Sequence, residues 1–195
     1  GFDLGITYRN RDNPFKYEIS ANISHVVNKL ESFGIAGKSE IFSSDYKNYY
    51  VGRIAEGEPI GHFYVLNALS IFQDQTEIDN YKSSEGNKIQ PYAQPGDVKF
   101  EDRNKDGVIS AKDRFNAGSS FPKLTYSLNF NADYKNFDLS MLLIGSQGNK
   151  IFNGLRLGGM IMQGTDYNNG PLILDRWTPS TKGNTVPRVT VKDQN

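Results

Sequence analysis

Side chains that carry oxygen recur at alternate positions between residues 102 and 113. They occupy positions 1, 3, 5, 9 and 12 of a twelve-residue stretch and are Asp102, Asn104, Asp106, Ser110 and Asp113. This is the spacing of the EF-hand calcium loop, in which a hard cation takes six to eight oxygen ligands. We expect Gly107 to permit the sharp turn, the Val108 carbonyl to supply a backbone oxygen and Ser110 to act through a water molecule. The pattern predicts a calcium site formed by Asp102, Asn104, Asp106, Val108, Ser110 and Asp113.

Two features distinguish this loop from a calcium-sensing EF-hand. Position 12 is Asp113 rather than Glu, so the closing carboxylate is one methylene shorter. The flanking residues do not favour paired helices, because 97–100 are expected to form a short extended segment and 115–122 are rich in Gly, Ser and Asn. We therefore expect a structural loop with a dissociation constant of roughly 10⁻⁴ to 10⁻³ M, as in extracellular modules. The alternative is a metal-free turn rich in Asp and Asn.

No catalytic constellation accompanies the loop. The two histidines, His25 and His62, are isolated, and the sequence has no cysteine, no HExxH motif and no GxSxG motif. Residues 145–150 resemble a phosphate-binding loop only superficially, and a turn at a strand end is the expected structure. Trp177 is expected to anchor a loop, with stacking on a sugar as the alternative. The sequence therefore predicts a protein that is not an enzyme, with no catalytic residues and no organic cofactor.

Composition excludes further classes of protein. Lys and Arg total 22 and Asp and Glu total 22, and the basic residues are scattered, so nucleic acid is not an expected partner. Without cysteine there is neither a disulfide framework nor a thiolate metal site. No apolar run is long enough for a transmembrane helix, although barrel strands give a much weaker signal. The 23 Phe and Tyr residues and 19 Gly favour β structure.

Alternation of apolar and polar residues predicts two antiparallel hairpins. The first occupies residues 1–27, and its apolar positions are Phe2, Leu4, Ile6, Tyr8, Phe15, Tyr17, Ile19, Ala21 and Ile23. The second occupies residues 123–146, and its apolar positions are Tyr126, Leu128, Phe130, Ala132, Tyr134, Phe137, Leu139, Met141 and Leu143. The polar face of the second hairpin fails at Leu142 and Ile144. The strand pattern is present from the first residue, which suggests a fragment of a longer chain.

Such alternation fits any half-buried antiparallel sheet, but its dimensions favour a membrane barrel. Tyr126 and Tyr134 are separated by about 26 Å along a strand, or roughly 20 Å of height at a tilt near 40°. That height is close to the ~25 Å apolar band that aromatic girdles border in outer-membrane barrels. Short hairpin turns combined with long intervening segments are also typical of such barrels.

The direction of the strands places the remaining residues. Because the strand before residue 28 and the strand after residue 122 run in opposite directions, residues 28–122 contain either no membrane crossing or an even number. We favour none, so residues 28–122 form an external excursion that contains the Asp102–Asp113 loop. Within it, residues 60–72 are expected to form a buried strand, and Asp74 with Glu77 predicts a short helix that ends near Lys82. Residues 147–195 form a second long external segment.

The order of motifs resembles the SusC/RagA family of TonB-dependent outer-membrane transporters. The resemblance covers most of the chain and is carried by ANISHVVNKL (21–30), GHFYVLNALSIFQDQTEID (61–79), PGDVKFEDRNKDGVISAKDR (95–114), YSLNFNADYKNFDLSMLLIGSQGNKIFN (126–153) and DRWTP (175–179). The resemblance implies a late-middle slice of a plugged barrel of roughly 22 strands. It also implies a position in the outer membrane of a Gram-negative bacterium, with residues 28–122 facing the exterior and the hairpins facing lipid.

The same resemblance implies import of oligosaccharides or peptides. The partners would be a SusD-like surface lipoprotein and, through parts of the receptor outside this chain, TonB. The alternative is a soluble calcium-stabilised β-domain for adhesion or glycan binding. A dockerin is rejected because it needs two such loops with helices. For the isolated chain we expect either self-association or rearrangement of the hairpins onto the core of the external segment.

Overall fold

The computed structural model describes residues 1–43, 50–156 and 170–190. The described residues are mainly antiparallel β-strands with few helices, which confirms the predicted fold class. The chain forms two compact units, Gly1–Tyr64 with Asn116–Ile151 and Val65–Phe115 with Phe152–Asn195. The expected excursion 28–122 is therefore divided between them. Part of the expected segment 147–195, residues 157–169 and 191–195, lies outside the described residues.

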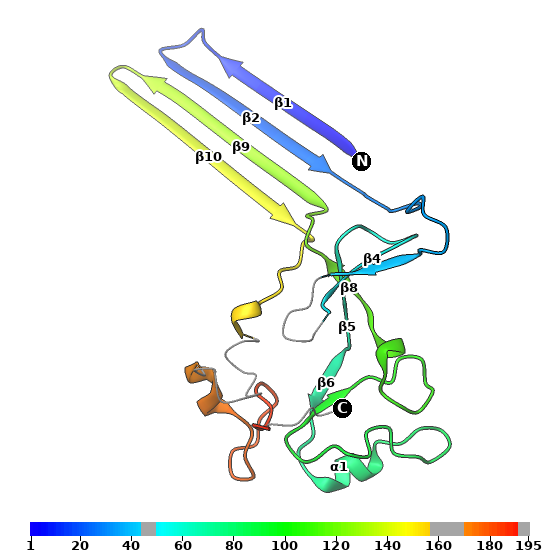
Figure 1. Ribbon diagram of the computed structural model, residues 1–195. Helices are drawn as coiled ribbons and strands as arrows, with labels where there is room; N and C mark the ends of the chain where they lie inside the picture. Colours follow the sequence, from blue (N-terminus) through cyan, green and yellow to red (C-terminus); the bar gives the residue numbers. More distant parts are fainter. Residues whose placement is uncertain (44–49, 157–169, 191–195) are drawn as a thin grey trace. The chain divides into compact units, whose positions relative to one another are not determined.

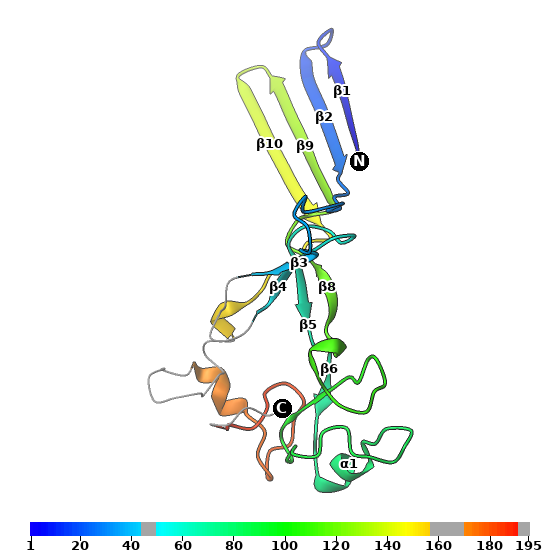
Figure 2. The same ribbon diagram turned by 45° about the vertical axis from the view of Figure 1, so that its right-hand side comes forward.

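A four-stranded antiparallel sheet contains both predicted hairpins (Figure 1). Its strands are β1 (Phe2–Asn10), β2 (Phe15–His25), β9 (Leu124–Tyr134) and β10 (Phe137–Gln147). The order in the sheet is β1-β2-β9-β10, so the two hairpins lie side by side through β2 and β9 (Figure 2). The second hairpin turns at Lys135, whose φ of 56° suits a two-residue hairpin turn.

The register aligns the apolar residues of all four strands in continuous rows on one face. One such row is Tyr8, Ile19, Phe130 and Met141. Large side chains on this face are exposed, for example Ile6 at 63% and Leu139 at 59%. Within the described residues, these side chains on the apolar face of the predicted hairpins are thus exposed.

Aromatic rings gather on the apolar face near the hairpin turns. Phe15 lies 5.6 Å from Tyr17 and 6.3 Å from Tyr134, and Tyr8 lies 5.9 Å from Tyr17, measured between ring centroids. At the other end of the sheet, Phe2 and His25 are in ring contact. Rings at both ends of an apolar face are typical of strands that end at membrane interfaces.

The opposite face of the sheet is polar and is linked by side-chain hydrogen bonds. Arg9 pairs with Glu18 at 2.6 Å, and the hydroxyls of Thr7 and Ser20 are 3.0 Å apart. Asn22 and Asn131 make further cross-strand bonds, to Ser127 and Ser140. Leu142 and Ile144, at which the polar pattern fails, are exposed on this face, as the sequence indicates.

A second sheet is built from shorter strands. They are β3 (Glu40–Phe42), β4 (Gly52–Ala55), β5 (His62–Val65) and β8 (Phe115–Ser119), in the order β3-β4-β5-β8. The prediction of a single buried strand for residues 60–72 is wrong. The stretch is divided into β5 and β6 (Ala68–Ile71), and Leu69 is 50% exposed. Apolar residues occur on both faces because the stretch crosses from one sheet to another, not because one strand is covered on both sides.

The second unit pairs β6 with β7 (Val98–Phe100) and places α1 (Gln75–Asn80) beside them. The predicted helix start is confirmed, because the Asp74 carboxylate caps α1 by accepting the Glu77 N–H. Phe72, Ile78 and Ala93 are buried together, and Tyr81 packs against them. The described residues also include two 3₁₀ turns, η1 (Ala111–Asp113) and η2 (Pro171–Asp175).

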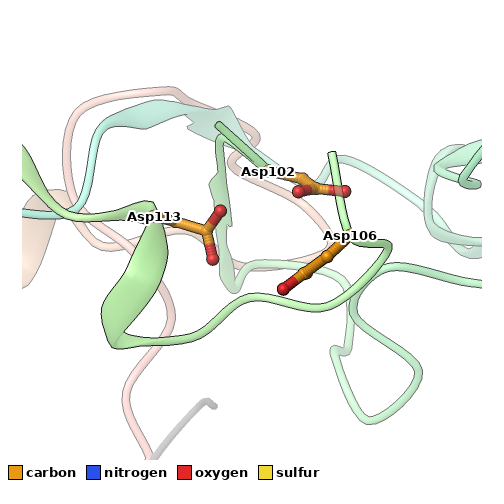
Figure 3. Close-up of side chains that lie close together, drawn as sticks. All are labelled: Asp102, Asp106 and Asp113. Atoms are coloured by element: carbon orange, nitrogen blue, oxygen red, sulfur yellow. The ribbon is translucent and has the colours of Figure 1, made fainter. Parts of the chain in front are cut away.

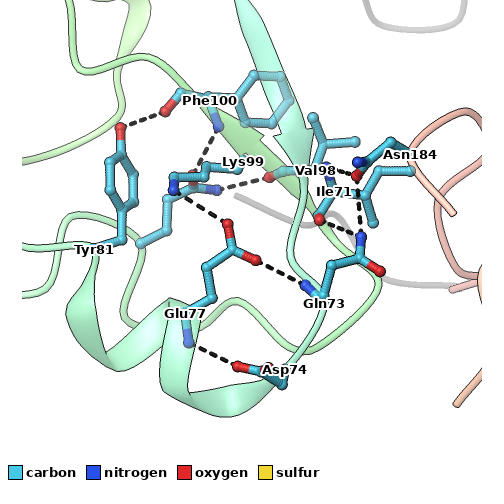
Figure 4. A network of polar contacts seen from close by, with 10 residues as sticks. Ile71, Gln73, Asp74, Glu77, Tyr81, Val98, Lys99, Phe100 and Asn184 are labelled. Atoms are coloured by element: carbon cyan, nitrogen blue, oxygen red, sulfur yellow. Dashed lines mark hydrogen bonds and ion pairs between the residues drawn. The ribbon is translucent and has the colours of Figure 1, made fainter. Parts of the chain in front are cut away.

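Polar contacts link residues 177–188 to residues next to β6 and β7. The Gln73 side chain donates to the Ile71 carbonyl and the Asn184 amide oxygen (Figure 4), and it accepts from the Trp177 indole at 3.1 Å. The Arg188 guanidinium pairs with both oxygens of the buried Asp97 carboxylate. These contacts fix the loop that carries Trp177.

Among the helices in the described part of the chain, none is both long and apolar enough to cross a membrane.

Candidate metal centre

The twelve-residue loop lies between two strands, of which the sequence predicts the extended segment before the loop. The strand β7 ends at Phe100, two residues before the loop, and β8 begins at Phe115, two residues after it. Within the loop, Gly107 has a φ of 88° and Lys105 a φ of 61°, so the chain reverses sharply at position 6. The side chain of Ser110 caps η1, which closes the loop.

Three carboxylates of the loop converge. One oxygen from each of Asp102, Asp106 and Asp113 lies within 4.8 Å of the others, and Figure 3 shows the three side chains pointing into one space. They differ in exposure, since Asp113 is fully buried, Asp102 is half-buried and Asp106 is exposed. The fold of the loop therefore brings together the three carboxylates predicted as ligands at positions 1, 5 and 12.

Asp113 is held by backbone donors on both of its oxygens. Its Oδ1 accepts the N–H groups of Arg103 at 2.9 Å and Asn104 at 3.3 Å, and its Oδ2 accepts the Ser110 N–H at 2.7 Å. Burial would raise the pKa of the Asp113 carboxyl, but these three N–H groups outweigh burial and lower the pKa below its ordinary value. Asp113 is therefore an ionised, preorganised residue at position 12.

Asp102 has an oxygen without a partner. Its Oδ2 accepts the Gly107 N–H at 2.9 Å, whereas its Oδ1 is buried and has no hydrogen-bond partner among the described residues. A buried carboxylate oxygen left unpaired costs free energy, and a bound cation would remove this cost. This orphan oxygen is the observation that best fits a metal ion in the loop.

The exposed side of the loop is organised by Asn104 and Asp106. The Asn104 amide donates to Asp106 Oδ2 and accepts the Asp106 N–H, both at 2.9 Å. Asp106 Oδ1 accepts the Val108 N–H at 3.2 Å. Ser110 Oγ accepts the Lys112 N–H and lies 3.4 Å from Asp113 Oδ2. All the predicted ligands therefore belong to one loop linked by hydrogen bonds. The residues whose carboxylate oxygens converge are Asp102, Asp106 and Asp113.

Tyr81 supports the loop from outside it, and nothing in the loop sequence predicts this contact. The Tyr81 hydroxyl donates to the Phe100 carbonyl at 2.6 Å and accepts the Asp102 N–H at 3.3 Å. Burial raises the pKa of this phenol. The sequence predicts that Tyr81 faces inward, but its hydroxyl contact spans 21 residues and no local pattern reveals it.

The donor set suits a hard cation. Carboxylate, amide, hydroxyl and carbonyl oxygens are the ligands that Ca²⁺ takes, usually six to eight of them. Within the described residues, the cluster of Asp102, Asp106 and Asp113 includes no histidine and no cysteine. A bound ion would therefore link Asp102, at the start of the loop, to Asp106 and to Asp113 in η1.

The histidines, Trp177 and residues 145–150, which the sequence offers as other candidate site residues, have structural roles. His25 Nδ1 lies 2.7 Å from the Lys123 carbonyl at a strand end. His62 is buried, with Nδ1 3.0 Å from the Pro59 carbonyl. Trp177 is buried and anchors its loop, as predicted. Residues 145–150 include the end of β10, which agrees with the expected strand-end turn.

The chain is similar over its whole length to proteins named as TonB-dependent receptors. It is 27% identical to TonB-dependent receptor P26 of Formosa agariphila over 96% of the chain and 18% of that relative. It is 26% identical to TonB-dependent receptor P3 of the same organism over the whole chain and 19% of that relative. No protein-family model matches the chain. The chain spans about a fifth of the length of these relatives.

Proposed function

We propose that this chain is a piece of the wall and external loops of a SusC/RagA-type TonB-dependent receptor. The receptor would lie in the outer membrane of a Gram-negative bacterium. The single observation that carries the proposal is the four-stranded sheet, whose rows of apolar side chains are exposed on one face while the other face is polar. A sheet of this kind is stable in lipid, because the bilayer covers the apolar face and the polar face lines the lumen.

The pairing of β2 with β9 supports an external position for residues 28–122. In an up-and-down barrel, strands that are neighbours in the sheet are also consecutive in the chain. Here β2 and β9 are neighbours although about a hundred residues separate them, and no described strand of residues 28–122 enters this sheet. The excursion is therefore proposed to be one long loop on the side opposite the short hairpin turns.

The activity proposed for the whole receptor is import, not catalysis. Cargo would be an oligosaccharide or peptide, captured together with a SusD-like surface lipoprotein, and energy would come through TonB. The likeness to named TonB-dependent receptors supports the role of TonB. The SusC/RagA motif order supports the lipoprotein and the cargo class. The external loops of this chain would contribute to the surface that meets the lipoprotein.

Calcium is proposed to stiffen one of those loops. Asp102, Asn104, Asp106, Val108, Ser110 and Asp113 would hold the ion, with the unpaired Asp102 Oδ1 as the oxygen that gains most. Ordering a loop costs roughly 1 to 2 kcal/mol of backbone entropy per residue, and a bound ion offsets part of that cost.

A soluble calcium-stabilised β-domain for adhesion or glycan binding is disfavoured. An independent soluble domain should cover its own apolar surface. The apolar face of the first sheet is instead exposed across all four strands, including Phe2 at 53%, Phe137 at 78% and Leu143 at 53%.

The barrel proposal is tested by placing one charge on either face of β9 in the full-length receptor. Phe130→Arg puts the charge on the apolar face, where arginine costs about 2 to 4 kcal/mol near the bilayer midplane. Asn131→Arg, the matched control on the next residue, puts it on the polar face. We expect Phe130→Arg to reduce the heat-modifiable, folded receptor in outer-membrane fractions severalfold and Asn131→Arg to change it little. Equal assembly of the two variants would contradict the proposal.

A further inference from the structure

Asp102, the first predicted ligand of the loop, is positioned from two sides. Its backbone N–H donates to the Tyr81 hydroxyl at 3.3 Å, and that hydroxyl donates to the Phe100 carbonyl at 2.6 Å. Its Oδ2 accepts the Gly107 N–H at 2.9 Å. Gly107 is buried, and a Cβ at this position would lie 3.1 Å from the Ser83 side chain. The placement of Asp102 therefore depends on Tyr81 directly and on Ser83 through Gly107.

Tyr81 and Ser83 belong to a segment that leaves α1 and turns back. The Tyr81 N–H donates to the Ile78 carbonyl at the end of α1, at 3.2 Å. The Tyr81 carbonyl accepts the Ile89 N–H on the far side of the turn, at 3.0 Å. These bonds join α1 to the turn after it, and we refer to residues 75–89 as the α1 segment.

The α1 segment depends on contacts with the rest of its unit. A helix of six residues is too short to be stable alone in water. Ile78 is buried in the core, and Tyr81 packs against that core. Lys99 pairs with Glu77 at 3.2 Å and lies 4.7 Å from the centre of the Tyr81 ring (Figure 4). At Tyr81, the core contacts of the helix thus meet the contact with the metal loop.

A cation in the loop would strengthen these contacts through Asp102. Asp102 Oδ1 is buried and has no hydrogen-bond partner among the described residues, so holding Asp102 in place costs free energy. With a cation in the loop this cost disappears, and the placement of Asp102 that the Tyr81 hydroxyl requires becomes more favourable. Coupling of this kind is reciprocal, so a contact through which calcium stabilises the α1 segment also raises the affinity for calcium.

We propose that Tyr81 is a positioning residue of the metal centre, through which calcium binding stabilises the α1 segment. The inference rests on the proposed calcium site and extends its effect to residues outside the loop. Tyr81 is not itself a ligand, because its hydroxyl acts on the backbone of Asp102. Calcium therefore orders both the loop and the α1 segment.

The test follows hydrogen exchange in the purified full-length receptor as calcium is added. Tyr81→Phe removes the hydroxyl and keeps the ring, and Tyr92→Phe, at an exposed tyrosine of the same unit, is the matched control. Slowed exchange of residues 102–113, plotted against calcium concentration, gives the affinity. We expect Tyr81→Phe to weaken calcium binding about 3- to 10-fold, the fold-change that corresponds to one hydrogen bond, and Tyr92→Phe to weaken it less than about twofold.

At saturating calcium, the loop and the α1 segment should respond differently to the loss of the hydroxyl. In the wild type, calcium should slow exchange severalfold in both stretches. In Tyr81→Phe, calcium should still slow exchange in residues 102–113, but its effect on the α1 segment should fall to less than half. A tyrosine with a merely structural role would change exchange in the α1 segment equally with and without calcium and leave the affinity unchanged, which would overturn the inference.

Other results overturn the inference in distinguishable ways. If calcium slows exchange in neither stretch of the wild type, both the proposed calcium site and the coupling are wrong. If calcium slows exchange only in residues 102–113 of the wild type, the calcium site stands and the coupling is wrong. If the wild type and Tyr81→Phe show the same affinity and the same protection of the α1 segment, the hydroxyl does not carry the coupling.

Discussion

The ring of Tyr126 lies against Gly145 on the neighbouring strand and covers the backbone that the glycine leaves bare. The two residues are direct cross-strand partners on the apolar face, and a Cβ at position 145 would overlap the Tyr126 ring. An aromatic ring over a glycine on the next strand is a known means of pinning register in a β-sheet. This contact helps to hold β10 in place against β9.

Gly145→Ala is expected to destabilise the first sheet. The ring must rotate away from its partner strand, and such overpacking costs about 1 to 2 kcal/mol. Gly5→Ala is the matched control, because a Cβ there meets only the end of the Asn22 side chain, which can move. Urea unfolding of the protein in detergent should show a lower free energy of unfolding for Gly145→Ala. The decrease for Gly5→Ala should be less than half as large. Equal losses would mean that the Tyr126 contact has no special role.

Arg188→Met is expected to destabilise the second unit by about 3 kcal/mol, because it leaves the buried Asp97 carboxylate without its partner. The double variant Asp97→Asn with Arg188→Met removes the unpaired charge. We therefore expect its free energy of unfolding to fall clearly less than that of Arg188→Met. Denaturant titrations of both variants give the comparison. A double variant that is less stable than Arg188→Met would contradict this account of the pair.

Acid should weaken the loop through Asp113. Its folded-state pKa is lowered, so it contributes stability above its ordinary value of 3.8, and that contribution is lost as pH falls through the lower folded value. Asp113→Asn should be less stable at neutral pH, because an amide nitrogen cannot accept backbone N–H groups. Its unfolding free energy should also fall less steeply than that of the wild type between about pH 4 and about pH 2. Parallel pH profiles would show that Asp113 is not the responsible group.

Calcium should stabilise the protein through the loop. With a dissociation constant of roughly 10⁻⁴ to 10⁻³ M, about 5 mM calcium would add about 1 to 2 kcal/mol to the free energy of unfolding. Asp106→Asn keeps an oxygen for the Val108 N–H but removes a charge, so it should abolish most of this gain. Asp79→Asn, which changes a half-exposed carboxylate outside the loop that pairs with Lys88, is the control. A thermal melt with and without calcium makes the measurement, and no shift in the wild type would leave only a metal-free turn rich in Asp and Asn.

Local patterns in the sequence predict the elements that depend on nearby residues. The hairpins follow from period-two alternation, which one register satisfies on both strands. The start of α1 follows from Asp74 and Glu77, which are three residues apart. The loop reversal follows from Gly107 and the alternating oxygen donors.

Contacts between distant residues have no such signal. Asp97 and Arg188 are 91 residues apart, and Gln73 and Trp177 are 104 residues apart, so their pairing depends on how the whole second unit folds. The stretch 60–72 shows the same limit, because apolar residues on both faces indicated one buried strand where the chain changes sheets. The convergence of Asp102 with Asp113 was predictable only because both belong to one local motif.

The central claim, that the first sheet is part of a membrane barrel, is tested most directly by spin labels along β9. Single cysteines would replace Leu128, Asn129, Phe130 and Asn131 in turn, in a cysteine-free full-length receptor placed in lipid vesicles. Labels at Leu128 and Phe130 should collide mainly with oxygen, which concentrates in lipid, and labels at Asn129 and Asn131 mainly with a water-soluble nickel chelate. Alternation with period two would support the barrel wall. Equal access of the nickel chelate to all four positions would contradict it.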